Sequence, residues 1–534
     1  QVELMNAFGE WIHKHSHAIY KTRGGPFYPF NEGISTRKGK KAWLFITNPE
    51  TENLKFNQLN QKLKTAKIFG SEKEVPFEIQ NNKIHFDLSG IQKTEPVFLI
   101  ELGFNKKVEM EEKQLKIKSM KLKLTLLIFL ILFVQFTVHS NDYFVRIDGC
   151  NNNSGSKNTP KEAWQTLEYA FSQIQAGDHL YVDDGIYIVD SLVLKGIIGA
   201  PEKITRIIAL NQWQAVITQN NSPEDNIDLV RIDSCAYLEF DGFEVTDPID
   251  KGVGITVRNR CHHVTVKNCY VHDCGCNGIS SRTSDYLTIE GNVVRGNARR
   301  SVWNCSGISI WHAIEKDQEP GYHIIIRNNV AFENECELPF SPLGHENPTD
   351  GNGIIIDDFR YTQVQFDGQK GGYKAAVLVE NNLTFNNGGR GINIYESENV
   401  TIRNNTSFHN MRIISKYTPE FGDVTIQNSS NVKLFDNIIV KDPSLPNPAV
   451  AIHCYNPEKS GNNKIMGNLV IGPKNFCGET QIIKNNTWYP PVSENVCGFQ
   501  NPTNQVQFNS VEDFKNYFGL KRNSNFEGKG WQNK

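Results

Sequence analysis

Side chains suited to acid, base or metal chemistry gather between residues 333 and 396. The first part of this segment holds seven carboxylates: Glu333, Glu335, Glu337, Glu346, Asp350, Asp357 and Asp358. The second part adds Arg390, Tyr395 and Glu396. Two carboxylates can flank and cleave a glycosidic bond, and grouped carboxylates can hold a hard cation such as Ca²⁺. The segment therefore favours chemistry on carbohydrates.

Two reactions fit these residues. In a glycoside hydrolase, Asp357 or Asp358 would pair with Glu396 across the scissile bond. In a polysaccharide lyase acting by β-elimination, Arg390 would be the base, and a Ca²⁺ held by Asp350, Asp357 and Asp358 would neutralise an acidic sugar. An arginine base is demanding, because its pKa lies above about 12. We slightly prefer the lyase, because a basic residue, several acids and aromatic rings fall on one expected face.

Other residues are expected to hold the substrate, which we take to be an acidic polysaccharide. The expected contacts are Arg282, Trp311, His312 and Tyr395. Aromatic rings can serve as platforms for sugars, and an arginine can pair with an acidic group. A third interpretation stays open, in which the chain is a glycan-binding protein or adhesin without catalysis.

These residues must be positioned by a repeat that fills the second half of the chain. An apolar residue, a polar residue, Asn, Asp or Gly, and a further apolar run recur with starts at Leu238, Val266, Ile289, Ile326, Val379, Ile402, Leu434 and Ile465. The starts are 28, 23, 37, 53, 23, 32 and 31 residues apart, which is typical of a solenoid with loops inserted into some coils. The longest interval contains the acidic segment. The pattern predicts an all-β fold, a right-handed parallel β-helix.

A second strand recurs between these turns, in GISSRT, GISIWH, GIIIDD, GINIYE, DVTIQN and AVAIHC. Because side chains alternate along a strand, its apolar residues should stack inward: Ile279, Ile308, Ile354, Ile392 and Val424, with Ile310, Ile356, Ile394 and Ile426. The alternate residues should form one outer column: Arg282, Trp311, Asp357, Tyr395, Gln427 and, with a less certain register, His453. This column is the expected substrate face.

The start of this half resembles a known family. The run YFVRIDGCNNNSGSKNTPKEAWQTLEYAFSQIQAGDHLYVDDGIY is similar to the cap and first coil of secreted right-handed β-helix proteins of the pectate-lyase superfamily. The resemblance covers about Tyr143 to Gly472 and implies that a helix, Glu162–Gln175, closes one end of the solenoid. The calcium strand and lysine of the lyases with a lysine base are missing, because Gly351, Asn352 and Ile355 occupy the Asp positions and Asn393 that of the lysine.

The first 105 residues resemble a different family. GEWIHKHSHAIYKT, GGPF and the short strand-like runs that follow are similar to the barrel end and the C-terminal β-sandwich of α-L-fucosidases. The catalytic residues of that family lie upstream of this region, so no catalytic role is carried over. We expect this half to be inactive alone.

A segment between the two halves has the pattern of an export signal. MKLKLTLLIFLILFVQFTVHS, residues 120–140, combines two lysines, an apolar run and small residues before Asn141. This predicts a protein that is secreted, periplasmic or on the cell surface, with no membrane contact apart from the signal. The expected domains are a fucosidase-like fragment (1–105), a charged linker (106–119), the signal (120–140), the β-helix (141–480) and a tail (481–534).

Net charge and cysteine content limit which binding partners and disulfides are expected. The formal net charge of the 534 residues is −3, which argues against nucleic acid. All 11 cysteines follow the apolar run, from Cys150 to Cys497. Export would allow disulfides, and an odd number leaves at least one thiol unpaired in the monomer that we expect.

Overall fold

The chain is described by a computed structural model, and it divides into two compact units, Gln1–Phe136 and Thr137–Lys534, each described by itself. The described residues are 14–19, 22–27, 33–47, 51–91, 97–108, 140–219, 228–247, 251–363, 371–413, 418–455, 457–477 and 482–490. The predicted signal lies outside them apart from Ser140. Among the described residues, no helix is long and apolar enough to cross a membrane.

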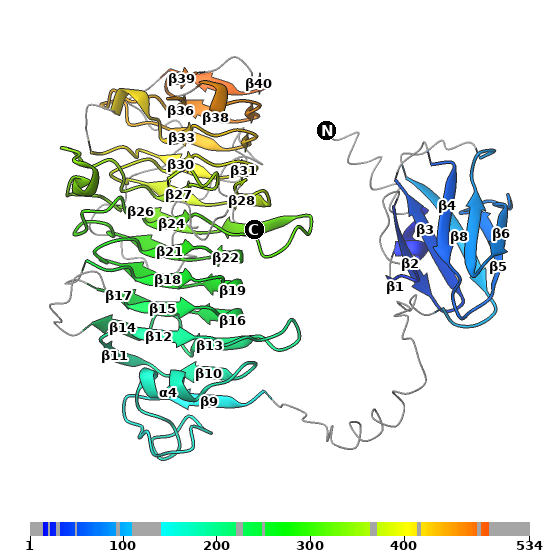
Figure 1. Cartoon of the computed structure of the whole chain (residues 1–534), viewed down its shortest axis with the longest axis horizontal. Coiled ribbons are helices and arrows are strands. Elements are labelled where there is room, and N and C mark those ends of the chain that lie inside the picture. Colours follow the sequence, from blue (N-terminus) through cyan, green and yellow to red (C-terminus); the bar gives the residue numbers. More distant parts are fainter. Residues whose placement is uncertain are drawn as a thin grey trace. The chain divides into compact units, whose positions relative to one another are not determined.

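The first unit contains two antiparallel sheets with a shared apolar core (Figure 1). One sheet has the order β1 (Arg23–Gly24), β2 (Gly33–Lys38), β3 (Lys41–Ile46), β8 (Phe98–Phe104) and β5 (Leu63–Ile68). The other has the order β4 (Asn53–Asn57), β7 (Lys83–Asp87) and β6 (Phe77–Gln80). Helix α2 (Ser16–Ile19) precedes them. Because Leu44, Ile84 and Phe86 are fully buried, the predicted sandwich-like fold is confirmed, whereas the fucosidase resemblance stays a prediction.

The second unit is a stack of coils whose strands form three long parallel sheets (Figure 1). Sheet 1 contains β12 (Leu192–Lys195), β15 (Val230–Asp233), β18 (Ile255–Arg258), β21 (Ile279–Arg282), β24 (Ile308–Trp311), β27 (Ile354–Asp357), β30 (Ile392–Tyr395), β33 (Val424–Gln427), β36 (Val450–His453) and β39 (Lys474–Phe476). Sheet 2 contains β9 (Asp142–Val145), β10 (His179–Val182), β13 (Thr205–Ala209), β16 (Ala236–Asp241), β19 (His262–Lys267), β22 (Asp285–Glu290), β25 (Tyr322–Arg327), β28 (Ala376–Glu380), β31 (Val400–Arg403), β34 (Lys433–Phe435), β37 (Lys464–Met466) and β40 (Ile482–Lys484). Sheet 3 contains β11 (Gly185–Val189), β14 (Ala215–Gln219), β17 (Glu244–Thr246), β20 (Tyr270–His272), β23 (Val293–Arg295), β26 (Val330–Phe332), β29 (Leu383–Phe385), β32 (Thr406–Phe408), β35 (Ile438–Val440), β38 (Leu469–Ile471) and β41 (Thr487–Tyr489). The predicted right-handed parallel β-helix is confirmed.

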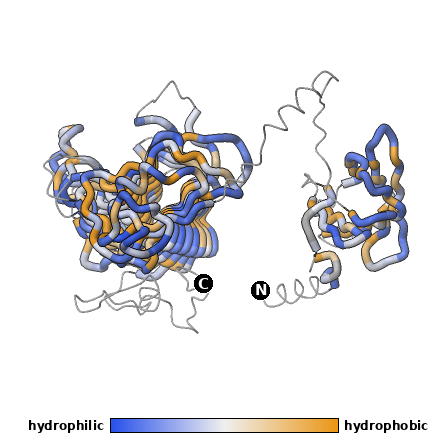
Figure 2. Tube along the Cα trace, turned by 90° about the horizontal axis from the view of Figure 1, so that it is seen from below, coloured by the Kyte–Doolittle hydropathy of each residue, from blue (hydrophilic) through white to orange (hydrophobic). Residues whose placement is uncertain are grey.

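The interior of the stack is built from the predicted apolar columns. Ile279, Ile308, Ile354 and Ile392 pair in register and are all fully buried. Viewed from below, residues of similar hydropathy line up along successive coils (Figure 2). Each fully buried isoleucine side chain stabilises the stack by about 1.5–3 kcal/mol, and the repetition fixes the register of every coil.

Buried asparagines hold the turn between sheets 2 and 3. One ladder contains Asn292, Asn329, Asn382, Asn405, Asn437, Asn468 and Asn486. Each side-chain amide donates to the side-chain oxygen of the next coil, for example from Asn382 to Asn405 at 2.9 Å. The residue before each ladder asparagine has a positive φ, such as 51° at Asn381, which asparagine and glycine tolerate best. The repeated asparagines are thus explained by the turn.

Three sequence expectations need correction. The capping helix α4 is Leu167–Gln173 and not Glu162–Gln175, because Thr166 caps it by accepting from the backbone N–H of Tyr169. The repeat copy taken to start at Leu238 is two residues out of register, since Phe240 pairs with Val266. The stacked strands extend to β41, beyond the predicted boundary at residue 480.

Disulfides Cys276–Cys305 and Cys454–Cys477 are present. Short 3₁₀ helices are η1 (Ser341–Leu343), η2 (Thr418–Glu420) and η3 (Pro457–Lys459).

Candidate functional site

The outer face of sheet 1 carries the predicted column of functional side chains. In successive strands, Arg282 pairs with Trp311, Trp311 with Asp357, and Asp357 with Tyr395. The column continues through Gln427 to His453. Trp311, Asp357 and Tyr395 are half-buried, so their outer atoms stay open to a ligand. The geometric prediction of one outer wall is confirmed, including the register of His453.

Asp357 is the most perturbed acid of this wall. Burial raises the pKa of Asp357 well above its usual range, and the neighbouring carboxylates Asp350, Asp358 and Glu396 raise it further by repulsion. A hydrogen bond from the side-chain Nε2 of Gln363 to Oδ1 of Asp357, 2.5 Å long, opposes this shift. Asp357 is therefore a carboxylic acid that keeps its proton at a higher pH than an exposed aspartate.

Asp358, predicted as a catalytic or metal-binding acid, does not line the wall. Its side chain has no exposed area and bonds to Nδ1 of His312 at 2.8 Å. Its other oxygen accepts from the backbone N–H groups of Thr362, at 2.6 Å, and Gln363, at 3.0 Å. His312 is equally buried, so the expectation that it contacts substrate is wrong. Together, Asp358 and His312 hold the loop that places Gln363 on Asp357.

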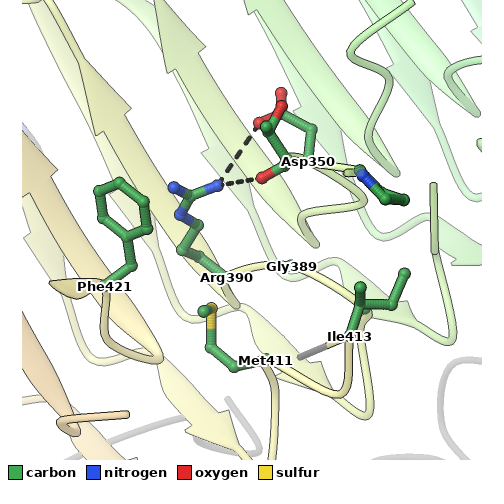
Figure 3. A pocket seen from close by; sticks show the side chains of 9 residues that line it. Asp350, Gly389, Arg390, Met411, Ile413 and Phe421 are labelled. Carbon is green, nitrogen blue, oxygen red and sulfur yellow. Dashed lines mark hydrogen bonds and ion pairs between the residues drawn. The ribbon is translucent and has the colours of Figure 1, made fainter. Parts of the chain in front are cut away.

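Arg390, the predicted base, is buried in the turn that precedes β30, beside Asp350 and Phe421 (Figure 3). Its Nη1 donates to the carbonyl oxygen of Thr349 at 2.5 Å and lies 3.5 Å from Oδ1 of Asp350. Its guanidinium lies 4.0 Å from the ring centroid of Phe421. The same residues line a pocket of about 20 Å³, room for about one water molecule. Arg390 thus serves as a fixed positive charge beside Asp350, which does not suit a base that must reach a substrate.

The environment of Asp350 raises its pKa, and opposing contacts limit the rise. Burial raises its pKa, whereas the charge of Arg390 and a hydrogen bond from Asn352 lower it. Glu396, the other predicted acid, lies half-buried at the end of β30 and accepts a hydrogen bond from the hydroxyl of Thr362. Asp350 and Glu396 are therefore the two carboxylates that could act together with Asp357.

The predicted Ca²⁺ site does not fit these residues. Asp350 pairs with Arg390, and Asp358 points away from Asp357 toward His312. Within the described ranges, no three His, Cys, Asp or Glu side chains come together as metal ligands. We therefore derive no reaction step through a cation.

Two contacts of the site were missed from the sequence. Gln363 and Phe421 come from loops between strands, whose lengths follow no repeat. The only signal for Phe421 was its place before the recurrent DVTIQN strand, and Gln363 gave none. The residues of the strands were predictable, whereas those of the loops were not.

A family model agrees with the fold. Residues 206–368 match the family model described as "Right handed beta helix region". A search of curated proteins found no match. Among solved structures, the chain is similar to the GH136 lacto-N-biosidase from Eubacterium ramulus, with 14% identity, coverage of 65% of this chain and 68% of that chain, and a TM-score of 0.39. It is also similar to pectate lyase Pel9A, with 16% identity, coverage of 55% and 76%, and a TM-score of 0.36. It is similar, too, to the A-module of the Azotobacter vinelandii mannuronan C-5 epimerase AlgE4, with 15% identity, coverage of 61% of this chain and 93% of that chain, and a TM-score of 0.30. The family match overlaps the coils of sheets 1–3 and agrees with a right-handed β-helix in the second unit.

Proposed function

We propose that the second unit is a glycoside hydrolase that binds a glycan chain along the outer face of β24, β27 and β30. Asp357 is the general acid that protonates the glycosidic oxygen as the bond to the anomeric carbon breaks. The observation that carries this role is the place of Asp357 on the open wall between Trp311 and Tyr395, with a pKa raised by burial and by three neighbouring carboxylates.

Asp350 is the second carboxylate of the reaction. The pKa of Asp357 is raised further than that of Asp350, because Arg390 opposes the effect of burial only at Asp350. Two acids whose environments push their pKa values apart can divide the roles of acid and base. Ionised Asp350 either attacks the anomeric carbon, giving retention, or takes a proton from the attacking water, giving inversion.

The site supports hydrolysis better than the β-elimination that we preferred from the sequence. Elimination needs a base that reaches the C5 proton and a positive charge on the sugar carboxylate. Arg390 is 4% exposed and engaged with Thr349, Asp350 and Phe421. A protonated acid on the wall suits hydrolysis, because the leaving oxygen must be protonated.

Product analysis distinguishes these reactions. The full chain is incubated with a panel of neutral and acidic polysaccharides, and reducing ends and ultraviolet absorbance of unsaturated sugars are followed together. Hydrolysis predicts reducing ends without absorbance, and Asp357→Asn should lower the rate about 10²–10⁴-fold. The matched control is Glu380→Gln, which removes a carboxylate at the end of β28, on sheet 2.

Two outcomes would contradict the proposal. Absorbance that rises with the reducing ends would make the enzyme a lyase. Retention of glycans by the wild type without any product, with Trp311→Ala weakening retention and Asp357→Asn changing nothing, would favour the glycan-binding protein instead.

A further inference from the structure

Three arginines lie on the outer face of sheet 1, in the coils that precede the acidic site. Arg258 of β18 pairs directly with Arg282 of β21, so that their Cα atoms are about 4.8 Å apart. Arg231 of β15 is in the neighbouring outer column and pairs with Thr256. Like charges placed opposite each other on a sheet destabilise it. The fold thus keeps the positive charges of Arg258 and Arg282 next to each other, although they repel.

Carboxylates of the protein satisfy one of these arginines. Arg258 lies 3.2 Å from Asp233 and 3.5 Å from Asp228. By contrast, the guanidinium groups of Arg282 and Arg231 form no hydrogen bond or ion pair with any residue in the described part of the chain, and Nε of Arg231 is buried. Burial and the charge of Arg258 lower the pKa of Arg282, and the charges of Asp228 and Asp233 oppose this shift without forming an ion pair with Arg282. The donors left for an anion are therefore those of Arg282 and the Nη groups of Arg231, since Nε of Arg231 is buried.

The distance of these donors from the acid site sets how long the ligand must be. Arg282, Trp311 and Asp357 are consecutive members of one column. Arg282 is therefore about 10 Å from Asp357 along the stack, two strand spacings away. An oligosaccharide spans that distance and a single sugar ring does not. Trp311, between them, offers an aromatic surface to the intervening sugar.

We propose that Arg282 and Arg231 form an anionic-sugar subsite, which binds carboxylate or sulfate groups of the glycan at about two sugar units (Arg282) and about four sugar units (Arg231) from the bond cleaved at Asp357. This inference rests on the proposed function for the position of the cleaved bond, but the binding of an acidic glycan is independent of cleavage. The substrate of this subsite is an acidic glycan. The arginines bind its anionic groups through charge-assisted hydrogen bonds and so select it over a neutral glycan.

Retention in affinity gels tests the subsite without relying on catalysis. The full chain with Asp357→Asn is run through gels that contain polygalacturonate, dextran sulfate or neutral dextran, at near-physiological ionic strength. We expect retention by one of the two acidic polymers, and which one identifies the anion as carboxylate or sulfate. Adding Arg282→Gln or Arg231→Gln should weaken that retention about 10- to 100-fold, and Arg282→Lys should restore part of it.

The control removes the same charge elsewhere. Arg327 is at the end of β25 on sheet 2 and pairs with Glu290 at the surface, so Arg327→Gln should leave retention unchanged. Equal losses in Arg327→Gln and Arg282→Gln, equal retention by neutral dextran, or no loss in either subsite variant would overturn the inference. If the subsite variants lose retention while Asp357→Asn retains full hydrolysis, the subsite stands and only the proposed catalytic role fails.

Discussion

Two of the turns that begin with a left-handed residue differ in how much they vary from coil to coil. Between sheets 2 and 3 the turn has two residues, as at 328–329, 381–382 and 404–405, and a ladder asparagine follows the left-handed one. Between sheets 1 and 2 the turn has two residues after Arg282, ten after Trp311 and eighteen after Asp357. Its left-handed residues differ in type: Thr283, His312, Asp358, Glu396 and Asn428.

This difference separates stability from chemistry. In the constant turn, the side-chain amide of each ladder asparagine donates to the asparagine of the next coil, so an inserted residue would break the ladder. In the variable turn, the longer loop after Asp357 bends back so that Asp358 accepts from the backbone of Thr362 and Gln363. Loops on a rigid scaffold can change without loss of the fold and often carry function. Substitutions in the constant turn should therefore lower stability more than activity, and substitutions in the variable turn should lower activity more than stability.

The largest expected effect is that of Asp350. Asp350→Ala should lower kcat by about 10³-fold, since one of the two reacting carboxylates is lost. If Asp350 is the nucleophile, added azide should restore turnover and give a glycosyl azide, detectable by mass spectrometry. Glu337→Ala, in the same segment but exposed and paired with Arg299, should keep full activity. If Asp350→Asn keeps full activity and Glu396→Gln loses it, Glu396 and not Asp350 is the second reacting carboxylate.

The next effect concerns stability through the constant turn. On one side, Asn405 accepts from Asn382 and donates to the carbonyl oxygen of Val379, and on the other it donates to the side-chain oxygen of Asn437. Asn405→Leu leaves several buried groups unsatisfied and should lower the free energy of unfolding by about 3–5 kcal/mol, measured by denaturant titration. Asn404→Gly, at the adjacent left-handed position, should change it by less than about 1 kcal/mol. Equal losses in both variants would mean that the ladder is not what stabilises the turn.

A smaller effect depends on pH. A second ladder runs through Asn297, Asn334, Asn387 and Asn410 and ends on Asp423. Burial raises the pKa of Asp423 to about 7. Because the folded state then binds more protons than the unfolded state, Asp423 destabilises the fold increasingly as pH rises from about 4 to about 7. Asp423→Asn should remove this loss, raising stability by a few kcal/mol at pH 8 and by little at pH 4.

Thermal unfolding of both proteins between pH 4 and pH 8 measures this difference. Asp148 is an exposed control, because a hydrogen bond from Arg146 lowers its pKa. Asp148→Asn should therefore not reproduce the gain at high pH. A gain for Asp423→Asn that is constant from pH 4 to pH 8 would show that titration of the carboxyl group is not its cause.

The same contrast explains what the sequence could predict. Register in the stack is set by side chains that repeat in every coil, so the column of Trp311, Asp357 and Tyr395 followed from strand alternation alone. The burial of Asp358 depends on His312 one coil away and on a loop that folds back, and neither is periodic. The position of Arg390 depends on Phe421 and Thr349, which come from two separate loops. Periodic patterns therefore indicated the wall and could not indicate which acids face it.

The finest effect is expected at Gln363, the contact that the variable turn adds to the acid. Its hydrogen bond opposes the raised pKa of Asp357, so Gln363→Ala should raise that pKa further. A general acid must be protonated, and the alkaline limb of the pH profile of kcat/KM should therefore move to higher pH. The rate at the optimum should fall about fivefold, the value of roughly one hydrogen bond, because a weaker and less fixed acid transfers its proton more slowly. Gln212→Ala, an exposed glutamine distant in sequence, should leave the profile unchanged. An alkaline limb that stays fixed in Gln363→Ala would mean that a group other than Asp357 supplies the proton.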